Sequence, residues 1–305
     1  MKRGKGIKIG VIGLGVMGNH YTRIISSLPR AKLAAVADID PQKTKEKAEE
    51  FKAKGFNNHL GLINEVEAIC LTTPTSTHFQ IAKDCLLANK HLLVEKPFTG
   101  NSAQARELIA IAHEKNLILA VNFTERYNPA FQILRRQLKD EKIIGINFKR
   151  LSPYPERITD TNVIFDLMIH DLDLLNLLVP DEIEKIKTAG EKVKSKSLDR
   201  VTTTIYYKSG IIASIEASRI FSIKTRKILV STERCLLEAD LLNKRIYRRD
   251  FSTAIPSVLP VNPTDQLTEV LKNFIAALSN KKSTLPTGKE ALQALQLAER
   301  IESLC

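Results

Sequence analysis

The spacing of three glycines constrains the fold of this 305-residue chain more than any other feature. Gly13, Gly15 and Gly18 follow an apolar run, Ile7–Ile12, and lie at the start of a segment with helical patterning, Met17–Leu28. Glycines at this spacing permit a tight turn, close approach of a pyrophosphate to the backbone, and close packing of the helix on the strand. The N-terminus of the helix then offers N–H groups and a favourable dipole to phosphate. The pattern predicts a strand–turn–helix unit that binds a dinucleotide.

An acidic residue closes the next predicted strand. Asp38 follows the apolar run Leu33–Ala37 and lies 20 residues after Gly18. A carboxylate at this place accepts hydrogen bonds from the ribose hydroxyls of a dinucleotide, and it repels a 2′-phosphate. The alternative is a glycine turn with a helix-capping aspartate, but the full order of strand, turn, helix, strand and Asp favours a cofactor site. We therefore expect NAD rather than NADP.

Short apolar runs alternate with amphipathic segments through the first 122 residues, as in successive βαβ units. The expected strands are Ile7–Ile12, Leu33–Ala37, Ala68–Thr73, His91–Glu95 and Leu117–Phe123, and the expected helices are Met17–Leu28, Pro41–Lys54, Ser76–Asn89 and Ser102–Lys115. Such alternation implies a doubly wound parallel sheet with helices on both faces. Residues 1–122 are predicted to form a Rossmann domain of the α/β class.

The pattern changes after residue 122, because strand-like runs follow one another without intervening helices. The runs are Ile144–Leu151, Val201–Tyr207, Ile211–Ala217, Ile228–Ser231 and Leu236–Ala239, and helices are expected over Asn128–Lys139, from near Thr161 to about Leu177, over Asp265–Leu278 and over Gly288–Ser303. The short segment Lys208–Gly210 between two of these runs predicts a hairpin. Residues 123–305 are predicted to form an α+β domain with a mainly antiparallel open sheet.

The formal net charge of +12 has two interpretations. It describes a solvated basic surface, or it attracts an anion such as a phosphorylated ligand, a nucleotide or a nucleic acid. Lysines and arginines are spread along the chain without a basic tail or a stripe of interleaved aromatic residues, which argues against a dedicated nucleic-acid binder. No apolar stretch approaches the ~20 residues of a membrane span, so we expect no membrane partner.

The four cysteines, Cys70, Cys85, Cys235 and Cys305, are far apart and form neither a CxxC pair nor a zinc spacing. A reducing compartment suits such thiols, so we expect a cytoplasmic protein. The apolar run near the N-terminus is too short for a signal peptide and is interrupted by glycines. No cluster of His, Cys and carboxylate residues indicates a metal, and none is expected.

Further motifs follow the glycine turn in a fixed order. Thr72–His78 follows one predicted strand, Glu95–Pro97 with the sequence Glu-Lys-Pro follows the next, and Asp166–Asp173 contains an Asp-x-x-x-His motif. This ordered set resembles the Gfo/Idh/MocA family, which comprises glucose–fructose oxidoreductase, inositol dehydrogenase and their relatives. The resemblance covers essentially the whole chain. It implies an NAD-dependent dehydrogenase that acts on a CH–OH group of a sugar-type substrate.

The resemblance implies that Lys96 is the catalytic lysine and that Asp166 and His170 are its partners. Histidine is the most frequent general base because its pKa lies near neutrality. A lysine ammonium stabilises a developing alkoxide. Asp166 and His170 stand four residues apart, so a helix places them on one face, where an ordinary hydrogen bond along the helix is the alternative. Asp166 then orients the imidazole or binds a sugar hydroxyl.

The remaining site assignments also follow from the resemblance. The implied cofactor-binding residues are Gly13, Gly15, Val16, Met17, Gly18, Asp38, Thr73, Pro74, His78, Glu95 and Lys96. The implied substrate-binding residues are Lys96, Asn122, Arg126, Tyr127, Arg157, Asp166 and His170.

Two segments, Glu125–Pro129 and Arg150–Asp160, resemble a subgroup of the family. Its members, the UDP-N-acetylglucosamine 3-dehydrogenases, oxidise the 3-hydroxyl of a nucleotide-linked amino sugar. Arg126, Arg150 and Arg157 would then contact a diphosphate, for which bidentate geometry favours arginine over lysine. The alternative is that these arginines form surface or interdomain ion pairs.

The chain departs from the common family pattern around its Asp-x-x-x-His motif. Many relatives carry glycines before and within the motif, whereas this chain has Thr161–Phe165 and Met168, which reduces backbone freedom. The family also includes non-catalytic NAD-binding sensors and regulatory partners, so that alternative stays open beside the dehydrogenase. An exposed sheet face in the second domain builds oligomers in this family, which implies a homodimer or homotetramer.

Overall fold

The computed structural model describes residues 6–155, 161–253 and 255–305. The chain forms two compact units. The first comprises Met1–Phe123 and Leu267–Leu292, and the second comprises Thr124–Gln266 and Gln293–Cys305. Within the described ranges, no helix combines the length and the apolar character needed to cross a membrane.

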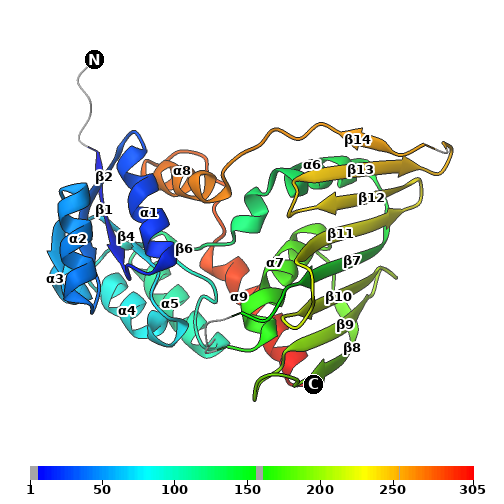
Figure 1. The fold of residues 1–305 in the computed structure, drawn as a ribbon, viewed down its shortest axis with the longest axis horizontal. Helices are drawn as coiled ribbons and strands as arrows, with labels where there is room; N and C mark the ends of the chain where they lie inside the picture. The colour runs from blue at the N-terminus through cyan, green and yellow to red at the C-terminus, as the bar shows by residue number, and fades with distance from the viewer. Residues whose placement is uncertain (1–5, 156–160, 254) are drawn as a thin grey trace. The chain divides into compact units, whose positions relative to one another are not determined.

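A parallel sheet forms the centre of the first unit (Figure 1). Its described strands lie in the order β3-β2-β1-β4-β5-β6, and every neighbouring pair is parallel. The strands are β1 (Ile7–Ile12), β2 (Ala31–Ala37), β3 (Lys54–Phe56), β4 (Ala68–Leu71), β5 (His91–Val94) and β6 (Leu119–Val121). The helices are α1 (Val16–Ser27), α2 (Pro41–Phe51), α3 (His59–Ile63), α4 (Thr75–Leu87), α5 (Ser102–Glu114) and α8 (Gln266–Leu278).

This topology confirms the predicted Rossmann fold. All residues of β4 and the last four of β1 are buried, as expected of parallel strands that are covered on both faces. The strand order reverses between β1 and β4, and doubly wound sheets bind ligands at such a reversal, outside the carboxyl ends of the strands. The glycine turn follows β1 at that place.

The first unit also contains residues 267–292, which were expected in the second domain. The N–H of Val121 donates to the carbonyl oxygen of Pro286, and Ala120 forms an antiparallel bridge with Thr287. Because β6 is the last strand of the sheet, its outer backbone groups need partners, and the returning segment supplies them. The structural boundary after Phe123 lies one residue beyond the predicted one.

A mixed sheet forms the centre of the second unit (Figure 1). The described strands lie in the order β14-β13-β12-β11-β7-β10-β9-β8, in which β7 and β10 are parallel and the other pairs antiparallel. The strands are β7 (Ile143–Leu151), β8 (Ile183–Glu191), β9 (Arg200–Tyr207), β10 (Ile212–Ser218), β11 (Thr225–Thr232), β12 (Cys235–Asp240), β13 (Arg245–Asp250) and β14 (Ser257–Leu259). The helices are η1 (Thr124–Tyr127), α6 (Pro129–Gln137), η2 (Leu138–Asp140), η3 (Ile164–Met168) and α7 (Ile169–Leu178), together with the part of α9 (Gly288–Glu302) from residue 293 onwards.

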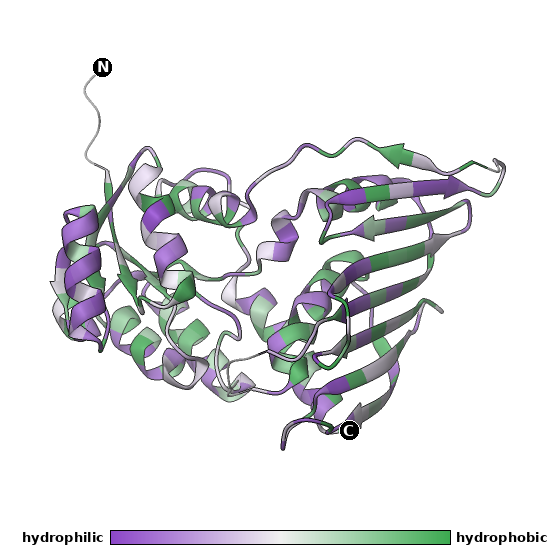
Figure 2. Cartoon of the chain, in the orientation of Figure 1, coloured by the Kyte–Doolittle hydropathy of each residue, from purple (hydrophilic) through white to green (hydrophobic). Residues whose placement is uncertain are grey.

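Side chains alternate along these strands between the core and the other face of the sheet. In β12, Cys235, Leu237 and Ala239 are buried and the residues between them are half-buried; Figure 2 shows alternating apolar and polar colours across the sheet. The buried face packs with α6, α7 and the second half of α9 in one core. Pairing of Ile212 with Tyr206 confirms the predicted hairpin. Oligomerisation through the opposite face stays a prediction.

Candidate functional site

The turn between β1 and α1 requires glycine at two positions. Gly13 has a φ of +92°, and a Cβ there would lie 2.8 Å from the backbone nitrogen of Thr73. A Cβ on Gly18 would lie 1.9 Å from the carbonyl oxygen of Gly13, so only glycine lets α1 pack this closely on the turn. Gly15 differs, because a Cβ there would meet no atom within 4 Å. The space beside Gly15 lets a ligand approach the backbone.

Asp38 is fixed next to this turn, at the carboxyl end of β2. Its Oδ2 accepts a hydrogen bond from the N–H of Leu14 at 2.6 Å, and its Oδ1 accepts one from the N–H of Asp40 at 2.9 Å. An ionised carboxylate has about four lone-pair sites, so both oxygens keep the capacity to accept from ribose hydroxyls. The next residue, Ile39, is 91% exposed and offers apolar surface beside the carboxylate.

These residues fit the phosphate and ribose parts of a nicotinamide dinucleotide. Helix α1 begins after Gly15, whose position carries no side-chain cap, so the first N–H groups of the helix suit a phosphate. Val16, at the first turn, is largely exposed. The fit therefore depends on backbone N–H groups, on the absence of a side chain at Gly15, and on the oriented carboxylate of Asp38.

A buried carboxylate organises the carboxyl ends of β5 and β6. The Oε1 of Glu95 accepts hydrogen bonds from the Tyr21 hydroxyl at 2.8 Å and from the Asn122 Nδ2 at 2.6 Å. The N–H of Lys96 donates to its Oε2 at 3.3 Å. Burial and the Glu95 charge raise the pKa of Tyr21 well above its usual value, which keeps the hydroxyl a donor. Tyr21 was not foreseen; a tyrosine in the first helix after a glycine turn was its only signal.

The buried side chain of His78 contacts two loops of the first unit. Its Nδ1 lies 2.9 Å from the carbonyl oxygen of Pro97, and its Nε2 lies 2.9 Å from that of Thr73. Burial lowers the pKa of His78, although the two carbonyl oxygens favour the protonated ring. The imidazole thus joins the loop after β4 to the loop that carries Lys96. A direct contact of His78 with the cofactor stays a prediction.

Asp166 and His170 lie on consecutive helical segments of the second unit, and both are half-buried. Asp166 belongs to η3, a π-helical turn, and His170 to the first turn of α7. The expected continuous α-helix was therefore wrong for the Asp166 turn. A π turn closes its hydrogen bonds over five residues instead of four and occurs frequently at functional sites.

The backbone leading into η3 is anchored by buried polar groups. The Arg219 Nη1 donates to the carbonyl oxygen of Thr161 at 2.9 Å, and the Arg219 Nε donates to the Asp199 Oδ1 at 2.9 Å. The Asn162 Oδ1 accepts from the N–H of Ile164 at 2.9 Å, which caps the start of the turn. The position of the predicted catalytic motif thus depends on the contacts of Arg219 with Thr161 and Asp199.

Two family models match this chain. Residues 7–123 match the oxidoreductase family with an NAD-binding Rossmann fold, and residues 144–237 match the Gfo/Idh/MocA C-terminal domain. The UDP-N-acetylglucosamine 3-dehydrogenase of Acidithiobacillus ferrooxidans is 31% identical over 303 residues, covering 97% of this chain and 96% of that one. The chain belongs to the Gfo/Idh/MocA family of oxidoreductases.

Solved structures share the fold of this Gfo/Idh/MocA protein over nearly its full length. The A. ferrooxidans enzyme superposes with a TM-score of 0.92 at 29% identity, covering 98% of this chain and 97% of that one. An inositol dehydrogenase homologue from Azotobacter vinelandii, complexed with NADH and myo-inositol, gives 0.87 at 17% identity over 99% and 96% of the two chains. A 3-ketoreductase from Actinomadura kijaniata, complexed with TDP-benzene and NADP, gives 0.86 at 18% over 97% and 96%. The last two matches establish the fold alone.

Two of the three arginines expected at a diphosphate lie in buried ion pairs of this Gfo/Idh/MocA protein. Arg126 is 7% exposed and pairs with Asp173, and Arg150 is 2% exposed and pairs with Asp171. Both arginines therefore form ion pairs, but these are buried within the second unit and are neither at the surface nor between the domains, as the alternative supposed. Arg157 lies outside the described residues. Tyr127, from the same predicted substrate set, is largely buried in η1.

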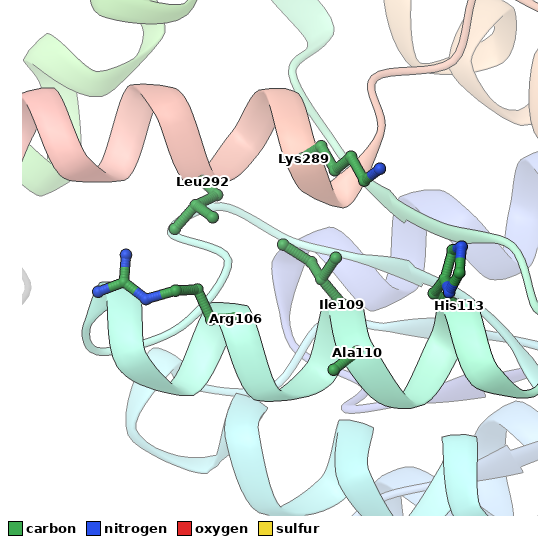
Figure 3. Close-up of a pocket in the computed structure, with 6 residues that line it drawn as sticks. All are labelled: Arg106, Ile109, Ala110, His113, Lys289 and Leu292. Carbon is green, nitrogen blue, oxygen red and sulfur yellow. The ribbon is translucent and has the colours of Figure 1, made fainter.

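A surface groove of about 470 Å³ lies on the first unit, between α5 and the start of α9 (Figure 3). Its lining residues are Arg106, Ile109, Ala110, His113, Lys289 and Leu292. None of them belongs to the predicted cofactor, catalytic or substrate set. The groove is therefore separate from the candidate site of this family member.

Proposed function

We propose that this Gfo/Idh/MocA protein is an NAD-dependent dehydrogenase that oxidises the 3-hydroxyl of a UDP-linked amino sugar. The observation that carries the proposal is its similarity, along nearly the whole chain, to a UDP-N-acetylglucosamine 3-dehydrogenase. The carboxylate of Asp38 beside the glycine turn supports the choice of cofactor.

The proposed chemistry assigns one role to each motif residue. A bound nicotinamide dinucleotide supplies the hydride acceptor. His170 accepts the hydroxyl proton as the substrate carbon is oxidised, since an imidazole is half-protonated near neutrality. Lys96 donates to the same oxygen and stabilises its developing negative charge. Asp166 orients the His170 ring or accepts from a second hydroxyl.

The choice of NAD over NADP is tested by replacing Asp38. We expect the wild-type protein to bind NAD more tightly than NADP, because the fixed carboxylate repels a 2′-phosphate. Asp38→Ala removes hydrogen bonds to ribose and is expected to weaken NAD binding roughly ten- to hundred-fold. It also relaxes the discrimination against NADP. Calorimetric titration with both cofactors measures the two effects.

Asp38→Asn provides the matched control. The amide oxygen still accepts from the N–H of Leu14 while the negative charge is lost, so NAD binding should fall less than in the alanine variant. Discrimination against NADP should relax in both variants. Equal or tighter binding of NADP by the wild-type protein would contradict the assignment.

The proposed substrate predicts that the nucleotide part contributes to recognition. We expect UDP-N-acetylglucosamine to be oxidised with a kcat/KM at least roughly ten- to hundred-fold above that of free N-acetylglucosamine, the effect of one or two charge-assisted contacts to a diphosphate. The increase in reduced-cofactor absorbance measures both rates.

Each assay is repeated with an added 2-oxoacid, because a tightly held cofactor needs an acceptor to turn over. Binding of the two sugars is measured in parallel by calorimetry. If the free sugar is used as well as the nucleotide-linked one, the UDP-sugar proposal is wrong and the family-level activity stands.

A further inference from the structure

Six charged side chains form ion pairs around helix α7 in the second unit. They are Glu125, Arg126, Arg150, Asp171, Asp173 and Arg226. Three carboxylates face three guanidinium groups, so the formal charges cancel. Five of the six side chains are at most 9% exposed, and Arg226 is 35% exposed. Ions buried this deeply are tolerated only when they are paired. We call this group the charge cluster.

Two bidentate pairs in the charge cluster hold helix α7. From β7, Arg150 donates through Nε and Nη2 to the two carboxylate oxygens of Asp171, at 2.9 and 2.7 Å. From η1, Arg126 donates through Nε and Nη2 to the two oxygens of Asp173, at 2.7 and 2.6 Å. A planar fork meeting a planar carboxylate fixes direction as well as distance. The two pairs therefore restrict both rotation and sliding of α7.

Glu125 connects the Arg150–Asp171 pair to other parts of the second unit. Its Oε1 accepts from the Nη1 of Arg150 and of Arg226, each at 3.0 Å, and its Oε2 accepts from the Nε2 of Gln266 at 3.2 Å. Burial opposes the charge of Glu125, but Arg150 and Arg226 outweigh it and hold its pKa below the usual value. Glu125 follows the place where the chain enters the second unit, and Gln266 is the last residue before it leaves.

The first residues of α7 leave one side chain partly accessible. Ile169 and all residues from 171 to 175 are buried, whereas His170 is half-buried. Asp171 and Asp173, which follow His170, point to different sides of α7, towards Arg150 and Arg126 respectively. The two ion pairs therefore hold the first turns of α7, which carry His170, on two sides of the helix.

We propose that Arg126 and Arg150, through Asp173 and Asp171, are positioning residues for the His170 base. The inference rests on the proposed function, because His170 is the proton acceptor there. Buried ion pairs add little stability over well-packed apolar residues, so the geometry that they impose is their main contribution. A displacement of ~1 Å in a catalytic group costs roughly 100-fold in rate.

The test uses a paired replacement to distinguish an effect on the position of His170 from an effect on the stability of the protein. Arg126→Met alone leaves Asp173 buried without its partner, and we expect a clear fall in Tm. Arg126→Met with Asp173→Leu removes both charges, so Tm should return to the wild-type value or above it. We expect kcat in the double variant to stay roughly 10- to 100-fold below wild type. The Kd for NAD should not change, because the glycine turn belongs to the other unit.

Two further measurements keep the test decisive. Hydrogen exchange of the α7 amides needs no substrate, and we expect faster exchange in the double variant at an unchanged Tm. Arg150→Lys keeps the charge but cannot donate two parallel hydrogen bonds to Asp171, so kcat should fall. Arg248→Lys should leave kcat unchanged. Arg248 is the matched control, since its Nε and Nη2 donate to Asp250 on β13, at 3.0 and 2.7 Å.

The possible outcomes distinguish the two proposals. Wild-type kcat and wild-type α7 exchange in the double variant would show that the ion pairs position nothing. His170→Ala is measured in the same assay. If that variant keeps near-normal turnover on an accepted substrate, the proposed role of His170 is wrong, and the positioning role is overturned with it.

Discussion

Lys96→Met is expected to lower turnover by at least ~100-fold while the Kd for NAD stays within a few-fold of wild type. Methionine keeps most of the length and the apolar stem of lysine but cannot donate a hydrogen bond to the substrate oxygen. The peptide N–H of Lys96, which donates to Glu95, is retained in the variant. The loss should therefore appear in kcat. Stopped-flow measurement of cofactor reduction tests it.

Lys90→Met is the matched control for this experiment. Lys90 precedes β5 at its amino end and donates to the carbonyl oxygen of Val66 at 2.9 Å, whereas Lys96 follows β5 at its carboxyl end. We expect normal turnover from Lys90→Met with at most a small loss of stability. Near-normal turnover of Lys96→Met on an accepted substrate would remove Lys96 from the mechanism.

Replacing Asp199 is expected to have the largest effect on stability. Asp199 is fully buried, and its Oδ2 accepts from the N–H groups of Val193, Lys194 and Ser195 at 2.7–2.9 Å. Its Oδ1 pairs with Arg219. Asp199→Ala leaves the buried arginine without its carboxylate, which costs about 3–5 kcal/mol. The corresponding loss in Tm is roughly 6–20 °C.

The same aspartate predicts a pH dependence with a definite sign. Burial opposes the charge of Asp199, but hydrogen bonds from Ser195, Val193 and Arg219 outweigh it and hold its pKa well below the usual value. A carboxyl whose pKa is lowered by folding stabilises the protein above its unfolded pKa of ~3.9, and that contribution is lost as the pH falls towards the folded pKa. The stability gap between wild type and Asp199→Ala should therefore narrow below about pH 4.

Urea unfolding at pH 7 and at pH 3 measures this gap. Asp181→Ala is the control, because Asp181 also accepts two backbone N–H groups, from Glu182 and Ser209, but is exposed. It should change Tm little. An equal Tm for wild type and Asp199→Ala at pH 7 would contradict the prediction.

Local patterns were sufficient to predict the part of the fold that holds the cofactor. The glycine turn, α1 and the carboxylate at the end of β2 follow from residues close together in the sequence, and each needs a particular residue type. The hairpin of β9 and β10 could also be predicted from the sequence, because the alternation of apolar residues continues on both sides of a short turn. In these places local propensity and tertiary structure agree.

Three strands at or near the edges of the second sheet, β8, β13 and β14, were not predicted from the sequence. In β8, Lys185 and Lys187 are exposed, and in β13, Arg245 and Arg249 are exposed. Each strand buries few side chains, so its apolar signal is weak. Charged side chains on edge strands also discourage pairing with other molecules. The composition that protects such strands thus hides them from a search for apolar alternation.

Long-range partners were the other missing information. Asp171 and Asp173 stand in an otherwise apolar helix, which signals that buried acids need cations. Nothing in the local pattern says that the cations are Arg150 and Arg126, respectively 21 and 47 residues earlier. Arginines near a catalytic motif suit a phosphate or a carboxylate equally well, and only the fold decides between them.

The return of residues 267–292 to the first unit affects how the protein can be made. N-terminal domains usually fold while the rest of the chain is still being synthesised. Here the edge of β6 lacks its partners until Pro286 and Thr287 have left the ribosome. A fragment ending near residue 122 would keep that edge open to association with other chains. Each unit consists of two separate segments of the chain, so the chain cannot be divided into its two units by one cut.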